Sequence, residues 1–349
     1  MADVHAVLLA GGKGSRFWPL SRQAKGKQFL SMLGDEPLLK QSIDRVSDLV
    51  KPDHYWIVGS HAHEQILEEF TSLVPKANML LEPKGRNTGP SIAWAAQAIE
   101  QVDPDAIILV LPADHWVDDA ARFCETLDVA VKEATQYPHI VTIGITPTFP
   151  HTGYGYIQVQ DQTGPIKSVN AFVEKPSLEQ ADMYLKKGTY FWNAGIFVAS
   201  VQTLSGLYRQ FQPEIWSLMH QIIKSTSLGQ VPELALFSDL ESISFDYAIM
   251  ELAVSKTRLV PANFKWGDIG SWSALAEFLP QDAANNACYG DVHALDSTGN
   301  LVYSPQKMVA LVDVDEMIVV DSPDAILVAP KSSDQKIKTL YEQLNPDYQ

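Results

Sequence analysis

VHAVLLAGGKGSR, residues 4–16, decides the fold, because it joins a short apolar run to a loop of glycines and positive charges. The run 6–10 has the length and composition of a strand buried between helices. Gly11, Gly12 and Gly14 follow it, and glycine allows positive φ and lets a ligand approach the backbone amides closely. We therefore expect a phosphate-binding loop at the end of the first strand of an α/β sheet.

This loop does not match the two common nucleotide motifs. A P-loop requires GxxxxGK[ST], but Gly26-Lys27 is followed by Gln28. The dinucleotide fingerprint requires glycine or alanine three residues after Gly14, where Phe17 stands. The loop must therefore bind phosphate in another way, or not at all.

Local charge favours the phosphate interpretation. The chain carries a formal charge of -16, yet no acidic residue occurs between Asp3 and Asp35. Such a local excess of positive charge attracts a polyphosphate strongly in a partly dehydrated site. The alternative is a glycine turn with solvated lysines. The basic side chains of this segment are Lys13, Arg16, Arg22, Lys25 and Lys27.

Composition excludes several classes of protein. A charge of -16 argues against a nucleic-acid binder, because a phosphate backbone is held mainly by surplus lysine and arginine. Cys124 and Cys288 are too far apart for a CxxC pair and predict neither a disulfide framework nor a zinc site. The first residues lack a basic segment, and the apolar run is too short for a signal peptide or a membrane span. We expect a cytoplasmic protein that binds neither nucleic acid nor membrane.

The first half of the chain reads as alternating strands and helices. Apolar runs at 6–10, 55–58, 106–111 and 140–145 predict parallel strands. The segments between them, 37–50, 62–73, 89–101 and 119–136, predict helices that cover the sheet.

The second half changes twice. From 150 to 200, glycines and turn residues between short runs predict mixed or antiparallel strands added to the same sheet, followed by helices over 201–224 and 244–254. After Asp282, closely spaced short β-rich runs suggest a few coils of a β-solenoid and a closing helix near 331–344. At 349 residues a large domain with a smaller companion is expected, and we place them at 1–280 and 281–349.

The chain resembles the sugar-phosphate nucleotidyltransferases, and within them most closely the mannose-1-phosphate guanylyltransferase branch. Residues 8–30, LLAGGKGSRFWPLSRQAKGKQFL, are similar to the family's GGxGxRxxPLS loop and its PKQF-type segment, with Gly26 where the family usually has proline. Further matches follow in family order through residue 272. They are EP at 82–83, RNTGP at 86–90, LPADH at 111–115, GYGYI at 153–157, VEKP at 173–176, NAGIF at 193–197, FDYA at 245–248 and WGDIG at 266–270.

This resemblance implies a Rossmann-like sheet of the GT-A type, and it also implies the following reaction. GMP passes from GTP to mannose 1-phosphate, giving GDP-mannose and pyrophosphate by in-line attack on the α-phosphorus with Mg²⁺. The alternatives are a same-fold enzyme for another base or sugar, such as GDP-heptose or glucose 1-phosphate, and a non-catalytic homologue that binds a nucleotide sugar. The resemblance also suggests a homodimer, and it suggests no isomerase domain of the kind that follows in longer bacterial members.

Asp114 can be placed from the residues themselves. It follows the strand 106–111, so its carboxylate lies at the carboxyl end of a strand, where α/β sheets bind ligands and where a hard oxygen ligand suits Mg²⁺. Read without the family, Asp114 is equally a helix N-cap, Asp268 a turn residue, and Lys175 with Glu174 a surface ion pair.

The resemblance assigns the remaining site residues. Catalytic roles fall on Arg16, Lys27 and Lys175. Nucleotide contacts fall on Leu9, Ala10, Gly11, Gly12, Lys13, Gly14, Ser15, Glu82, Arg86, Asn87, Thr88 and Pro112. Contacts to the sugar phosphate fall on Asp114, Tyr154, Gly155, Glu174, Lys175, Asn193 and Asp246. The Mg²⁺ ligands are Asp114 and Asp268.

Overall fold

The computed structural model describes residues 2–160 and 163–349. They divide into two compact units, which we describe separately. The first contains the residues up to Gly11 and Gln41–Gly267, and the second contains Gly12–Lys40 and Asp268–Gln349. No helix among the described residues is both long and apolar enough to cross a membrane.

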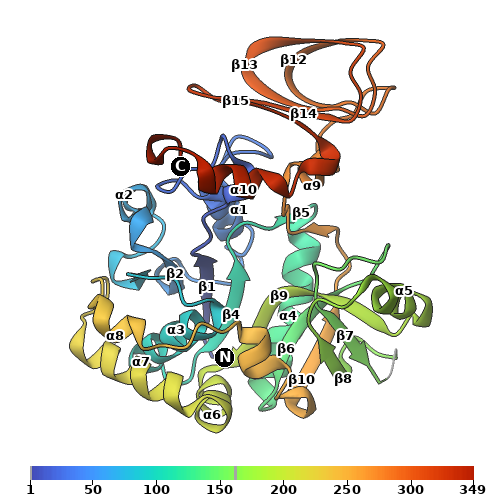
Figure 1. The fold of residues 1–349 in the computed structure, drawn as a ribbon. Helices are drawn as coiled ribbons and strands as arrows, with labels where there is room; N and C mark the ends of the chain where they lie inside the picture. The colour runs from blue at the N-terminus through green and yellow to red at the C-terminus, as the bar shows by residue number, and fades with distance from the viewer. Residues whose placement is uncertain (1, 161–162) are drawn as a thin grey trace. The chain divides into compact units, whose positions relative to one another are not determined.

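A mixed sheet forms the centre of the first unit (Figure 1). Its strand order is β3-β2-β1-β4-β9-β6-β10-β8-β7, and β5 pairs separately with β11. The strands are β1 (Val4–Ala10), β2 (Tyr55–Ser60), β3 (Met79–Glu82), β4 (Ile107–Pro112), β5 (Trp116–Val117), β6 (Ile140–Ile145), β7 (Tyr156–Val159), β8 (Lys167–Val173), β9 (Tyr190–Ser200), β10 (Thr257–Pro261) and β11 (Trp266–Gly267).

The sheet confirms the predicted fold class. Strand β1 pairs in parallel with β2 and β4, and β2 pairs in parallel with β3. The later strands change direction, because β9 runs antiparallel to β4, β6 and β7. The parallel strands therefore end at one edge, and β9 brings later residues of the chain beside that edge.

The helices of the first unit cover the sheet. Helix α3 contacts β1 and β2, and α4 contacts β6 and β9. The bounds are α2 (Glu64–Leu67), α3 (Thr88–Val102), α4 (Ala120–Gln136), α5 (Leu178–Lys187), α6 (Val201–Phe211), α7 (Pro213–Ser225), α8 (Leu234–Ser238) and a π-helix labelled η7 (Asp246–Met250), while α1 (Leu38–Asp44) joins the two units.

Two of the predicted helices are confirmed as α3 and α4, and others are shorter than expected. The helix predicted over 37–50 ends at Asp44, because the next amides bond three residues back, as in Ser47 to Asp44. The helix over 62–73 reduces to α2 between 3₁₀ turns, and Pro213 begins a new helix inside the segment 201–224.

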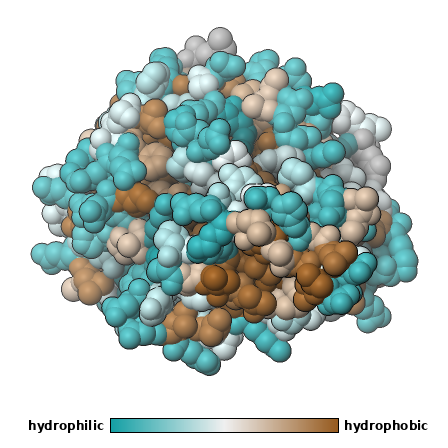
Figure 2. Space-filling model, turned by 90° about the horizontal axis from the view of Figure 1, so that it is seen from above, coloured by the Kyte–Doolittle hydropathy of each residue, from teal (hydrophilic) through white to brown (hydrophobic). Residues whose placement is uncertain are grey.

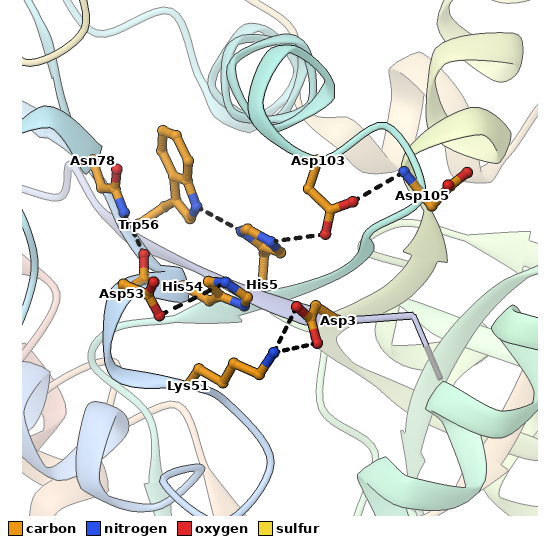
Figure 3. Close-up of polar contacts among 9 residues, drawn as sticks. All are labelled: Asp3, His5, Lys51, Asp53, His54, Trp56, Asn78, Asp103 and Asp105. Atoms are coloured by element: carbon orange, nitrogen blue, oxygen red, sulfur yellow. Dashed lines mark hydrogen bonds and ion pairs between the residues drawn. The ribbon is translucent and has the colours of Figure 1, made fainter.

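A polar cluster lies at the start of β1 (Figure 3). The ring of His5 stacks on that of His54 with centroids 4.0 Å apart. Its Nδ1 accepts a hydrogen bond from the Trp56 indole, and its Nε2 lies 3.4 Å from Asp103. Burial, and then the neighbouring His54, lower the pKa of His5. This cluster anchors the beginning of β1, and the glycine loop follows its other end.

The second unit contains a coil of strands and the closing helix. Strands β12 (Ala287–Leu295), β13 (Leu301–Val312) and β14 (Met317–Asp321) pair in parallel, so that Ala287 lies opposite Leu301 and Leu301 opposite Ile318. This confirms the solenoid-like module, which β15 (Ile326–Pro330) completes as an antiparallel strand (Figure 1). The helices are α9 (Trp272–Ala276) and α10 (Lys336–Gln343).

The predicted domains, 1–280 and 281–349, stay a prediction. The division into compact units places the glycine loop, although it lies near the start of the chain, in the same unit as the solenoid strands.

Candidate active site

Backbone groups from β1 and β4 meet at the carboxyl edge of the sheet. Leu9 lies opposite Pro112 in the strand register, and the amide of Ala113 donates to the Leu9 carbonyl at 3.1 Å. Gly11 follows at the edge, where an added Cβ would stand 3.9 Å from the Glu82 carboxylate. The edge thus offers close backbone approach beside an acidic side chain.

Glu82 is the last residue of β3, and its side chain is almost fully buried. Ser91 on α3 donates a hydrogen bond to its Oε1 at 2.6 Å. Burial raises the pKa of Glu82 to about 7, against the opposing effect of the Ser91 hydrogen bond. Near neutral pH this group can therefore either accept hydrogen bonds as a carboxylate or donate one as an acid.

The residues that begin α3 have partners in the same unit. Asn87 has a φ of 66° and caps α3 by accepting from the Thr88 amide. The Arg86 guanidinium donates to the carbonyls of Phe237 and Ser238, and the Thr88 hydroxyl accepts from the amide of Phe245. These side chains fix the start of the helix.

Asp114 lies in the turn after β4, half-buried. The next residue, His115, accepts a hydrogen bond from the Trp266 indole at 3.1 Å. The Arg45 guanidinium donates to the His115 carbonyl at 3.3 Å and lies over the Phe123 ring. Burial lowers the pKa of Arg45 to about 10, so a desolvated positive charge stands directly behind this turn.

Asn193 is held from two sides. Its amide nitrogen donates to Asp246 at 2.8 Å, while its carbonyl oxygen accepts from the Gly195 amide and, at 3.4 Å, from Thr142. Burial, and then the nearby Glu174, raise the pKa of Asp246 to about 6. The hydrogen bonds orient the Asn193 amide, which lies on β9 and pairs through its backbone with Gly155.

Gly155, Glu174 and Lys175 form a compact group. An added Cβ on Gly155 would stand 2.5 Å from the Glu174 carboxylate, so a side chain here would displace that carboxylate. Lys175 pairs with Glu174 at 2.8 Å, and that hydrogen bond raises the pKa of Lys175. The residue has a φ of 47°, a strained conformation that occurs often at functional sites. Tyr154 packs between His151, Trp192 and Trp266.

In the second unit, the glycine loop folds back on itself. Gly14 has a φ of 64°, and its carbonyl accepts from the Phe17 amide and from the Ser21 hydroxyl. Lys13 and Arg16 are exposed, whereas Lys27 is only 5% exposed and donates to the Asp268 carbonyl at 2.5 Å. Lys27 and Asp268 therefore lie together, with the Asp268 carboxylate 3.3 Å from where a Cβ on Gly270 would stand.

Asp114 belongs to the first unit and Asp268 to the second, and each can be compared with the ligands that Mg²⁺ prefers. No group of three or more potential ligands occurs in residues 2–160 and 163–349. Mg²⁺ does not require one, because it is usually bound by one or two carboxylates together with substrate phosphates and water. Both residues supply the hard carboxylate oxygens that this ion prefers.

The sequence pattern of the Nucleotidyl transferase family matches residues 5–285, which is most of the chain. The chain belongs to this family. The pattern of the MannoseP isomerase/GMP-like beta-helix domain matches residues 290–344 of this nucleotidyl transferase.

Known relatives span almost all of this nucleotidyl transferase. Mannose-1-phosphate guanylyltransferase 2 of Escherichia coli O157:H7 is 35% identical and the putative mannose-1-phosphate guanylyltransferase of Vibrio cholerae 37% identical, each over 98% of the chain and 74% of the relative. A crystal structure from Thermus thermophilus, described as a mannose-1-phosphate geranyltransferase, superimposes with a TM-score of 0.87. It is 32% identical and covers 98% of this chain and 99% of its own.

Within each unit of this nucleotidyl transferase, the structure brings many of the expected residues together. Glu174, Lys175, Gly155, Asn193 and Asp246 lie in one neighbourhood of the first unit. Lys27 and Asp268 lie in one neighbourhood of the second.

Sequence reasoning missed the residues that support this site. Ser91, Thr142, Arg45 and Trp266 contact the expected residues, but none was assigned. Trp266 is the first residue of the matched motif WGDIG, and Ser91 directly follows the matched motif RNTGP, so both motifs were signals. Thr142 on β6 and Arg45 in the turn after α1 carry none.

Proposed function

We propose that this chain transfers GMP from GTP to mannose 1-phosphate, releasing pyrophosphate and leaving GDP-mannose. The observation that carries the proposal is the glycine loop, with exposed Lys13 and Arg16 and with Lys27 buried against Asp268. The relatives named as mannose-1-phosphate guanylyltransferases support the choice of substrates.

Positive side chains and loop amides bind the triphosphate in this proposal. Arg16 contacts phosphate oxygens through its planar fork, Lys27 as a point charge, and both stabilise the departing pyrophosphate. The amides of residues 12–15 add donors, which Gly14 allows by its positive φ. Such transfers depend mainly on positioning and on neutralising charge on the bridging oxygens.

Guanine is read by Glu82 and by backbone groups of Leu9, Ala10, Gly11 and Pro112. The guanine edge presents a ring N–H beside an amino group, and an ionised carboxylate accepts from both. Arg86, Asn87 and Thr88, which were assigned to the nucleotide, act by fixing the start of α3, because their side chains bond to nearby backbone.

The sugar phosphate is bound by the second group of residues in the first unit. Lys175 contacts the phosphate, Glu174 and Asn193 accept or donate to sugar hydroxyls, and Gly155 contributes through its backbone. Tyr154 packs against the ring, and Asp246 holds Asn193 in place. The sugar phosphate oxygen then attacks the α-phosphorus in line as pyrophosphate leaves.

Asp114 and Asp268 would hold Mg²⁺, which when bound neutralises charge on the phosphate oxygens. Asp114 at the end of β4 is fixed by the turn that His115, Trp266 and Arg45 support. Asp268 is fixed through its own carbonyl by Lys27.

A substrate panel tests the proposal. Purified protein is incubated in Mg²⁺ with each of GTP, ATP, UTP and dTTP against mannose, glucose and a heptose 1-phosphate, and nucleotide sugars are quantified. GTP with mannose 1-phosphate is expected to give the highest kcat/KM. Good turnover of another pair, with no GDP-mannose formed, overturns the proposal.

We also propose a homodimer and a cytoplasmic location. Apolar side chains gather on the face seen in Figure 2. Two free thiols, Cys124 and Cys288, suit a reducing compartment.

Light scattering at micromolar concentration tests the dimer, and a mass of one chain contradicts it. Large apolar side chains that are about 60% exposed on the module strands support it: Leu295, Met308, Val312, Ile326 and Val328.

A further inference from the structure

The segment after the glycine loop carries contacts that the proposed reaction does not use. Ser21 is fully buried, and its hydroxyl donates to the Gly14 carbonyl at 2.6 Å. Whatever fixes Ser21 therefore also fixes the conformation of the loop. Trp18 and Arg22 stand on either side of it.

Trp18 is tied to residues far along the chain. Its indole donates to the Tyr348 carbonyl at 2.9 Å, and its own carbonyl accepts from the Trp272 indole at 3.1 Å. Both tryptophans are buried, with exposed fractions of 7% and 0%. A buried indole N–H without its acceptor is costly, so these bonds constrain the backbone at Trp18.

Arg22 also links this segment to a residue far along the chain. One guanidinium nitrogen donates to the carbonyls of Pro19 and Ser21, and the other donates to Asp324 at 2.8 Å. Asp324 lies in the turn between β14 and β15 and also accepts from Ser322. Burial alone would raise the pKa of Asp324, but the hydrogen bonds from Arg22 and Ser322 hold it below the usual value.

Two further hydrogen bonds of the same unit hold the segment 18–31. The Gln23 amide donates to the Gln349 carbonyl at 3.0 Å. The Tyr303 hydroxyl on β13 donates to the Ser31 carbonyl at 3.1 Å. The solenoid strands and residues 345–349 thus contact the segment 18–31 at several points rather than one.

We propose that the C-terminal module positions the glycine loop for the triphosphate, with Trp18, Arg22 and Asp324 as positioning residues. Asp324 accepts a hydrogen bond from Arg22, and the Tyr348 carbonyl accepts one from Trp18. Arg22 and Trp18 stand on either side of Ser21, and the Ser21 hydroxyl donates to the Gly14 carbonyl. This inference rests on the proposed function of the loop. It gives the module a role in nucleotide binding, although none of the residues assigned to the nucleotide lies in the module.

Asp324→Ala tests the inference, because Asp324 lies outside the loop and its carboxylate is the side-chain partner of Arg22. We expect the KM for GTP to rise about fivefold, the largest effect that loss of one half-exposed ion pair produces. The KM for mannose 1-phosphate at saturating GTP should stay unchanged. Glu342→Gln is the matched control, because it removes the Lys338–Glu342 ion pair of α10 in the same unit.

Two further variants separate positioning from mere stability. Trp18→Phe keeps an aromatic ring but removes the indole donor to Tyr348, and it should raise the KM for GTP in the same selective way. Arg22→Ala and Asp324→Ala should be non-additive, so that the double variant binds GTP no more weakly than Arg22→Ala alone. Thermal unfolding is measured for every variant.

Equilibrium binding of GTP with Mg²⁺, measured by calorimetry, distinguishes the possible failures. Wild-type protein that binds no GTP overturns the proposed function and this inference with it. Wild-type protein that binds and turns over GTP, while Asp324→Ala and Trp18→Phe lower only the melting temperature, overturns the inference alone.

Discussion

Glu82 combines burial with a pKa near the working pH. Burial raises its pKa to about 7, so the folded chain holds this proton between pH 4.5, the ordinary value, and about 7. The contribution to stability is therefore present below pH 4.5 and is lost as the pH rises through that window, because the folded chain must then bury the charged form, which the unfolded chain leaves in water. Binding has the opposite requirement, since an ionised carboxylate is needed to accept from guanine.

Binding of GTP should therefore weaken as the pH falls below 7. One unit below the pKa about a tenth of Glu82 is ionised, which predicts a roughly tenfold higher KM for GTP. The Glu82→Gln variant, which cannot titrate, serves as the control for the titration of GTP itself. Equal pH dependence in both proteins between pH 6 and pH 8 would show that Glu82 does not read the base.

Asp268 is expected to matter for turnover and not for folding. Asp268→Asn removes a hard ligand while changing little volume, so kcat should fall by at least about a hundredfold, or about 2.7 kcal/mol of barrier. Lys27 bonds to the Asp268 backbone, which the substitution leaves in place. Activity is measured across a Mg²⁺ titration; wild-type rates at limiting Mg²⁺ would remove Asp268 from the metal site.

Among the residues, the sequence alone could identify those in motifs and not those that support them. Glu82, Asn193 and Asp268 stand in matched segments. Ser91, Thr142 and Arg45 contact expected residues only because strands and helices bring them together, with Arg45 and His115 separated by 70 positions. No local pattern encodes such a contact.

The glycine loop depends on the conformation of one residue. Gly14 has a φ of 64°, and an added Cβ would stand 2.6 Å from the Lys27 amide nitrogen. The sequence predicted a loop of this kind from its glycines, and the structure adds that the loop closes against the 3₁₀ turn that carries Lys27, η2 (Lys27–Phe29).

Gly14→Ala should therefore be destabilising. Positive φ costs a side chain about 1–2 kcal/mol, and the overlap with Lys27 adds about 1–3 kcal/mol. Gly206→Ala is the control, because Gly206 lies inside α6 with no atom near an added Cβ, and it should stabilise by about 0.5–1 kcal/mol. Chemical denaturation compares them; equal stabilities would contradict the proposed geometry.

Elements differed in how well the sequence predicted them. Strands β1, β4 and β6 follow from apolar runs of five residues or more. Strand β3 (Met79–Glu82) was missed, because its apolar run covers only residues 79–81 before the charged Glu82, and so short a run does not separate strand from turn. The helix expected over 37–50 ends at Asp44, because amides that follow it donate to carbonyls three residues back rather than four.

The whole chain is organised differently from its order in sequence. Residues 12–40 belong to the compact unit of 268–349, and single hydrogen bonds join positions 330 residues apart, as from Trp18 to Tyr348. Apolar periodicity predicted both the sheet and the solenoid-like module. It carries no information on which distant segments pack together.

A chain ended after residue 280 should consequently lose more than the module. Trp272 would lose the ring of Tyr303, and Ser273 would lose its acceptor Asp334. We expect low soluble yield or a protein that does not bind GTP, and a chain ended after residue 343 should be less affected. A soluble 1–280 protein with full affinity for GTP would instead support two independent domains.

The fate of the α-phosphorus tests the central claim most directly. Wild-type protein is incubated with GTP labelled at the α-phosphate, mannose 1-phosphate and Mg²⁺, and the products are separated. The proposed reaction predicts that label leaves GTP only into GDP-mannose, with one unlabelled pyrophosphate formed for each. Label that remains in GTP, or that accumulates in GDP or GMP without GDP-mannose, would contradict it.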